Sequence, residues 1–181
     1  MLVLAGGGSK IHRGTTTVNH NTGAGATITT DVDITSLGLT DLNKSAEKLK
    51  GFTINGQSIG QARLLLTSLT NLRVITYSSN NLFTITVEWE IEAGSTLSVT
   101  RVTTTHVTGA GDYCAETNET IASVGDTSKA EAICNGATTG TTQYLNPKVK
   151  LTGPTTLNVK QTAQGGGITI TAQSLVLKRA A

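Results

Sequence analysis

The sequence predicts an all-β protein built from two tandem antiparallel β-sandwich units, and three observations lead to this prediction. The segment LTSLTNLRV at residues 66–74 returns as LTGPTTLNV at residues 151–159. Apolar and polar residues alternate over residues 83–91, which is the period of a half-buried strand. No stretch longer than about ten residues shows the period of an amphipathic helix. These patterns favour a small β-rich unit that occurs twice.

The repeat extends well beyond these two segments. The offset between residues 66 and 151 also relates Asp41 to Asp126, Lys44 to Lys129, Gly51 to Gly136, and the tripeptide TIT at 84–86 to its copy at 169–171. No gap is needed across this span, so we infer an internal duplication. We therefore expect an N-terminal arm over residues 1–12, a first sandwich unit over residues 13–93 and a second unit over residues 94–181.

The strands of the first unit are predicted where β-branched and apolar residues gather between turn signals. The expected strands are residues 13–18, 26–34, 46–54, 62–66, 72–77 and 83–91. The expected turns are residues 22–25, the pair Asn55–Gly56 and residues 78–81, because Gly and Asn tolerate positive φ. Residues 37–44 form a connection with room for a helical turn.

The second unit repeats this order with local differences. Residues 101–105 echo 13–17, residues 108–111 echo 22–25, and the connection before Asp126 is shorter than the one before Asp41. In the closing strand, residues 168–176, Ser174 replaces Trp89 and the run Leu175–Leu177 breaks the alternation. We expect a bulge or a changed edge environment there, with Leu175 facing a partner and Lys178–Arg179 as a solvated tail.

The N-terminal arm carries no recognisable chemistry. The string GGGSK lacks the spacing and the preceding strand of a phosphate-binding loop. The apolar residues 1–4 are followed by glycines too soon for a signal peptide, and no apolar run approaches the roughly 20 residues of a membrane-spanning helix. We expect a flexible or partner-bound terminus, synthesis in a cytosol and no membrane contact.

Bulk composition favours assembly over catalysis or nucleic-acid binding. Charged residues make up 14% of the chain, against about 25% in an average soluble domain. The formal charge of +2 is too small to indicate a nucleic-acid partner, and aromatic residues at 3% offer few stacking platforms. A neutral, Thr-rich surface suits a protein that packs against other copies, so a homo-oligomer is expected.

No pattern predicts a catalytic, cofactor-binding or metal site. His12, His20 and His106 lack metal-ligand spacing and are expected as surface histidines. No Ser, His and acid recur in a recognisable order. Glu88 with Glu90, and Glu116 with Glu119, are carboxylate pairs on strand faces. Asp31, Asp33 and Asp41 could together bind calcium, but this set is not repeated in the second unit. Asp41 and Asp126, with Lys44 and Lys129, are expected to fix turns or to form surface ion pairs.

The cysteines Cys114 and Cys134 both lie in the second unit, and the first unit has none at the matching positions. They could form a disulfide between neighbouring strands or remain two half-buried thiols. A reducing compartment favours the thiols.

The segments KIHRGTT (10–16), DLNKS (41–45), LTSLTNLRV and TVEWEIE (86–92), with Arg63, resemble the small β-rich virion structural proteins of tailed bacteriophages. The resemblance implies a non-enzymatic component of the virion, made in the host cytoplasm, that is tail- or fibre-associated or decorates the head. Its partners would be other virion proteins, without cofactors. The alternative is a module that binds a host-surface receptor or glycan, although sparse aromatic residues argue against a sugar ligand.

Overall fold

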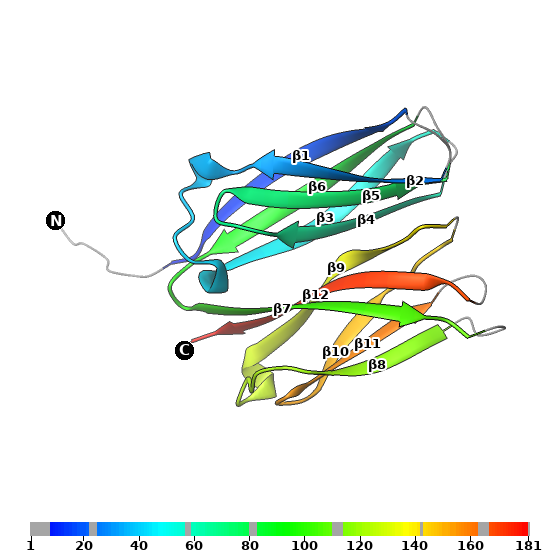
Figure 1. Cartoon of the computed structure of the whole chain (residues 1–181). Helices are drawn as coiled ribbons and strands as arrows, with labels where there is room; N and C mark the ends of the chain where they lie inside the picture. Colours follow the sequence, from blue (N-terminus) through cyan, green and yellow to red (C-terminus); the bar gives the residue numbers. More distant parts are fainter. Residues whose placement is uncertain are drawn as a thin grey trace.

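The computed structural model describes residues 8–21, 25–56, 59–79, 83–109, 114–141, 143–162 and 167–180, and this part of the chain is mostly β-strand (Figure 1). The strands are β1 (Lys10–His20), β2 (Ala26–Asp33), β3 (Ser45–Asn55), β4 (Gly60–Leu66), β5 (Asn71–Ser78), β6 (Phe83–Ala93), β7 (Leu97–Val107), β8 (Cys114–Thr120), β9 (Ala130–Thr139), β10 (Lys148–Gly153), β11 (Thr156–Thr162) and β12 (Thr169–Arg179). The helical segments are short 3-10 turns at Thr35–Leu37, Leu42–Lys44 and Thr127–Lys129.

The two halves of the chain have the same strand order. In the first half the sheets are β1-β6-β3 and β2-β5-β4, and in the second half they are β7-β12-β9 and β10-β11-β8. Every pairing is antiparallel, and a contact between β4 and β9 joins one sheet of each half into the order β2-β5-β4-β9-β12-β7. Figure 1 shows the two sandwiches one above the other. The prediction of an all-β antiparallel fold is confirmed.

Details of the strands agree between the halves as well. The pairing of β3 with β6 shifts between Leu49 and Gly51. The pairing of β9 with β12 shifts at the matching place, where Cys134 pairs with Ser174 and Ala137 pairs with Ala172. The Ile34 N–H donates to the Thr70 carbonyl at 2.9 Å, and the matching bond from Ile121 to Thr155 is 3.0 Å. An internal duplication would produce these agreements between the two halves. Their common origin stays a prediction.

The repeated aspartates fix turns, as expected. Asp41 Oδ1 accepts a hydrogen bond from the Asn43 N–H at 2.8 Å, and Asp126 Oδ1 accepts one from the Ser128 N–H at 2.9 Å. Each aspartate thereby caps the 3-10 turn that leads into the third strand of its half.

Each sandwich has its own apolar core. The alternation predicted over residues 83–91 is confirmed, because Ile85, Val87 and Ile91 are fully buried between the sheets of the first half. They pack with Leu64, Leu72 and Val74 from the opposite sheet. The second core is formed by Leu157, Val159, Ile170 and Ala172 in the matching strands. The repeated segments at 66–74 and 151–159 therefore supply matching core residues.

The replacement of Trp89 by Ser174 is matched by a second change across the strand pair. Trp89 lies opposite Gly14, whereas Ser174 lies opposite Val102. A Cβ at Gly14 would lie 2.2 Å from Trp89 Cζ2, so the indole occupies the space of the missing side chain. A large residue on one strand is thus accommodated by a small one on its neighbour in each half.

Replacing Gly14 by alanine is expected to lower the free energy of unfolding by about 2 kcal/mol, because the indole must move from a well-packed site. Chemical denaturation with Trp89 fluorescence measures this. Gly153→Ala is the control, since a Cβ there meets its nearest atom only at 3.8 Å. Equal stability of both variants would contradict the packing argument.

Two predicted boundaries need correction. Strand β1 begins at Lys10, so residues 10–12 belong to the sheet and not to the arm, because β6 extends to Ala93 and pairs with them. Strand β12 runs to Arg179, which pairs with Leu97, so Lys178–Arg179 is not a solvated tail. The predicted turns at 22–25, 78–81 and 108–111 fall partly outside the described residues, as do residues 1–7 of the arm.

Candidate functional site

The line where the two halves meet, here called the seam, holds the structure's most specific side-chain arrangement. Arg63 of β4 pairs with Gly136 of β9. Gly136 has a φ of +91°, and a Cβ there would lie 2.1 Å from the Ala62 carbonyl oxygen. Only glycine allows the two strands to approach this closely.

Two amide side chains continue the hydrogen bonding across the seam. Asn135 is fully buried, donates through Nδ2 to the Glu47 carbonyl at 2.8 Å and accepts from the Leu49 N–H at 3.2 Å. Gln61 accepts from the Thr139 N–H at 2.6 Å and donates through Nε2 to the Gln143 carbonyl at 2.9 Å. Each amide therefore bonds to backbone groups of the opposite half much as a neighbouring strand would.

A buried ion pair completes the seam. The Glu47 carboxylate has an exposed fraction of 0% and lies 2.7 Å from Arg101 Nη2. Arg101 Nε also donates to both Glu47 oxygens, and Nη1 donates to the Leu42 carbonyl at 3.0 Å. Burial acts most strongly on this carboxyl and raises the pKa of Glu47, while the guanidinium acts in the opposite direction. The bidentate geometry is that of a charged pair.

Apolar packing accompanies these polar contacts. Ala46 of the first half clusters with Leu97, Val99, Leu175 and Leu177 of the second. The broken alternation at Leu175 is thereby explained, because both faces of β12 are buried and the expected partner of Leu175 is the other half of the same chain. The two sandwiches therefore form one packed body.

Beside the seam lies a cleft with an uncharged lining, which we call the seam cleft. Its volume is about 270 Å³. It is lined by Leu49, Phe52, Gly60, Gln61, Ala62, Cys134, Gly136, Ala137, Leu145 and Pro147. Phe52 and Tyr144, which stands next to Leu145, are among the exposed large hydrophobic residues. Clefts between packed units are common ligand sites.

The histidine prediction is wrong for two of the three residues. His20 and His106 are buried, with exposed fractions of 1% and 7%. His20 Nε2 lies 2.9 Å from Thr76 Oγ1, and His106 Nδ1 lies 2.9 Å from Thr117 Oγ1. Each histidine lies on the inner face of its strand and bonds to a threonine of the opposite sheet. Desolvation lowers the pKa of both imidazoles.

These histidines predict a loss of stability in mild acid. The folded state holds them neutral, so the unfolded chain takes up protons first as pH falls below 6.5. We expect urea midpoints to be constant above about pH 7.5 and to fall between pH 6.5 and pH 5.5. His20→Gln with His106→Gln should flatten this dependence. An unchanged slope in the double variant would contradict the assignment.

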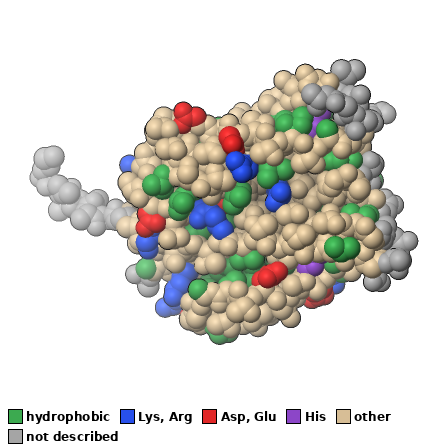
Figure 2. Space-filling view, viewed as in Figure 1, with side chains coloured by type: hydrophobic (Ala, Val, Ile, Leu, Met, Phe, Trp, Pro, Cys, Tyr) green, Lys and Arg blue, Asp and Glu red, His purple; other side chains and the backbone are tan. Residues whose placement is uncertain are grey.

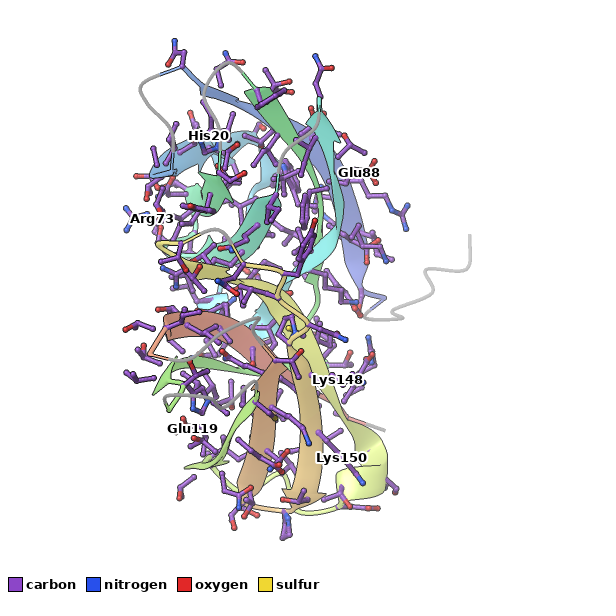
Figure 3. The ribbon with its side chains drawn as sticks, turned by 90° about the vertical axis from the view of Figure 1, so that its right-hand side faces the viewer. His20, Arg73, Glu88, Glu119, Lys148 and Lys150 are labelled. Carbon is purple, nitrogen blue, oxygen red and sulfur yellow. The ribbon has the colours of Figure 1, made fainter. Side chains whose placement is uncertain are left out.

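The predicted carboxylates do not converge on one place. Glu88 is exposed, but Glu90 is buried with Arg13 Nε at 2.9 Å, so the pair is not simply a solvated face. Hydrogen bonds from Arg73 hold the pKa of Asp31 at about 2, and Asp33 accepts from Thr35. In Figure 3, Arg73, Glu88 and Glu119 lie on three different strands, and Lys148 and Lys150 lie together on β10. Within the described residues, no three His, Cys, Asp or Glu side chains group closely enough to bind a metal ion.

Both cysteines are free thiols, so the disulfide considered for Cys114 and Cys134 is not formed. Cys114 is exposed on β8, and Cys134 is half-buried on β9 in the other sheet of the second sandwich. Burial raises the pKa of the Cys134 thiol, which does not favour a nucleophilic role.

Comparison of the chain with known protein families, with curated proteins and with solved structures found no match. Among the described segments, no helix has the length and hydrophobicity needed to cross a bilayer.

Proposed function

We propose that this chain is a non-enzymatic structural component of a tailed-phage virion, associated with the tail or fibre or decorating the head, and that it acts by protein–protein assembly. The observation that carries the proposal is the seam, where a shared sheet and a buried ion pair join two sandwiches into one body. A building block needs such fixed geometry, because its neighbours must meet it in one orientation.

The surface supports the same proposal. Figure 2 shows a face made mostly of backbone and of side chains that are neither charged nor hydrophobic, with charged and hydrophobic side chains in small separate groups. Exposed strand positions are often threonine or asparagine, as at Thr15, Thr17, Thr27, Thr29, Asn118 and Thr120. Such groups form hydrogen bonds across an interface without the cost of burying unpaired charge. The resemblance of residues 10–92 to virion proteins gives the proposal its setting.

Protein mass spectrometry of purified, intact virions tests the proposal. We expect the chain in the particle fraction at a fixed copy number per virion, retained after nuclease treatment and a salt wash. Electron microscopy with an antibody to the chain should label either the tail or the head. Absence of the chain from particles of a phage that expresses it during infection would overturn the proposal.

The mass of the purified chain in solution gives a second test, independent of the virus. A chain that assembles is expected to form trimers or larger rings at micromolar concentration, well above the 18.7 kDa of one copy. A strict monomer at all concentrations would count against assembly through its own surfaces.

A further inference from the structure

We propose that a pocket at one end of the first sandwich, here called the end pocket, binds a carboxylate group carried on a short apolar stem. This inference goes beyond the proposed function, because it assigns a ligand chemistry to a site away from the seam. Three features carry it: lysines without ion-pair partners at the rim, an apolar part of the wall, and basic residues that the second half does not repeat.

Strand pairing fixes the rim of the end pocket. Lys10 of β1 and Ser45 of β3 both pair with Ala93 of β6, so the three strands lie side by side at this end of the sandwich (Figure 1). Lys44 precedes Ser45, and its carbonyl accepts a hydrogen bond from the Gly94 N–H at 3.0 Å. The pocket has a volume of about 410 Å³, and its lining includes Lys10, His12, Leu37, Leu39, Asp41 and Lys44.

The lysines of the end pocket are not neutralised by the chain itself. Within the described residues, neither Lys10 nor Lys44 forms an ion pair. Asp41 is the acid in the lining, and its Oδ1 already accepts the Asn43 N–H at 2.8 Å. Residues 1–9, which lead into β1, contain no acidic side chain. Positive groups therefore outnumber negative ones in the pocket, which favours an anionic ligand.

His12 adds a hydrogen-bonding group to the pocket. It lies two residues along β1 from Lys10, on the same face of the strand. Its Nε2 atom is buried and has no hydrogen-bond partner in the part of the chain that the structure describes. A buried nitrogen without a partner costs free energy, and a ligand oxygen that reached the imidazole would remove this cost.

Part of the wall is apolar, which determines the rest of the ligand. Leu37 and Leu39, in the connection between β2 and β3, line the pocket and pack against the core of the first sandwich. A bare inorganic ion would leave these side chains in contact with water. A short aliphatic stem would cover them, and burial of its apolar surface would add to the affinity.

The second half does not repeat the basic residues of β1. When the opening strands of the two halves are aligned, Lys10 corresponds to Ser98 and His12 corresponds to Thr100. The shared fold therefore does not require a lysine and a histidine at these positions. Their presence in the first half is explained by a ligand that binds there.

Titration of the full chain with butyrate, followed by NMR of the backbone amides, tests the proposal. We expect saturable shifts at residues 37–45 and 93–95, and no such shifts with butyramide, which carries the same stem without the charge. Lys10→Gln with Lys44→Gln should weaken butyrate binding about tenfold or more, because each lysine supplies a charge-assisted hydrogen bond. Lys129→Gln, at the position that matches Lys44, is the control and should leave binding unchanged.

Four results would overturn the proposal. They are the lack of a saturable shift with butyrate, equal shifts with butyramide, unchanged butyrate binding in the lysine double variant, and tighter binding of inorganic phosphate than of butyrate. The comparison with butyramide uses the natural chain, so it holds even where the double variant is less stable.

Sedimentation of the chain with saturating butyrate identifies the source of the carboxylate. If an acidic group of a neighbouring copy fills the pocket, butyrate and the lysine double variant should both weaken association. If the ligand is a free small acid, association should be unchanged, and either result supports the site. Because these measurements use purified protein, a failed titration would leave the virion proposal intact, and absence of the chain from virions would leave the site intact.

Discussion

Replacing Arg101 by methionine is expected to lower the free energy of unfolding by about 3 kcal/mol at pH 7. The change leaves the Glu47 carboxylate buried without its partner, and breaking a buried ion pair from one side costs about 3–5 kcal/mol. The lower end applies because the Arg101 side chain is 18% exposed, so water can enter the space. Urea or guanidinium denaturation measures the loss.

The pH dependence of this variant identifies the cause. Without the guanidinium, burial alone raises the pKa of Glu47 above its ordinary value of 4.5. A raised folded pKa gives stability that is complete below the unfolded pKa and is lost as pH rises through the folded one. The free energy of unfolding that Arg101→Met loses relative to the natural chain should therefore be small near pH 4 and large at pH 7.

The first half provides a matched control. Arg13 lies opposite Glu90 as Arg101 lies opposite Leu175, so the two arginines have equivalent sheet positions. The Arg13 side chain is 70% exposed, and Lys48 Nζ remains 3.7 Å from the Glu90 carboxylate when Arg13 is removed, so Arg13→Met should cost less than about 1 kcal/mol. Glu47→Leu with Arg101→Met should recover most of the loss, because neither charge is then buried alone. Equal costs for both arginine variants would contradict a special role for the seam.

The strands could be predicted because their signals are local. Turn residues such as Asn55–Gly56 mark the strand ends, and the alternation over residues 83–91 gives both strand and buried face. The buried histidines also had a usable signal, since His20 shares a strand face with the buried Val18. Treating each histidine only as a possible metal ligand overlooked the ordinary period of the strand.

The seam could not be predicted, because it depends on which strand edges meet. The broken alternation at Leu175–Leu177 indicated a covered face but not that the same chain covers it. The available signal for the seam was the set of positions at which the two repeats differ. The seam uses different residues from each half, whereas the repeated fold uses the same ones. Three seam residues have unlike counterparts at the matching positions: Glu47 with Ala132, Gln61 with Asn146, and Asn135 with Lys50. Polar residues that differ between repeats thus indicate where two copies of a fold meet.

Replacing Gly136 by alanine is expected to lower the free energy of unfolding by about 4 kcal/mol, the largest effect of any single substitution considered. The new Cβ would lie 2.1 Å from the Ala62 carbonyl oxygen and 2.9 Å from Leu49 Cδ2, and φ is +91°. Backbone strain of about 1–3 kcal/mol and a clash of about 1–3 kcal/mol act together. Because the Arg63–Gly136 contact joins the sheets of the two halves, the halves should no longer unfold together in this variant.

Two measurements distinguish loss of the seam from general unfolding. Each half keeps its own core, so Gly136→Ala should unfold in two steps where the natural chain unfolds in one. Hydrogen exchange should first increase at the backbone of β4 and β9. Gly51→Ala is the control at the matching position of the first half, where a Cβ meets nothing within 4 Å. It should leave stability unchanged or raise it by up to about 1 kcal/mol. A single transition near the natural midpoint for Gly136→Ala would show that the two sandwiches do not depend on this contact.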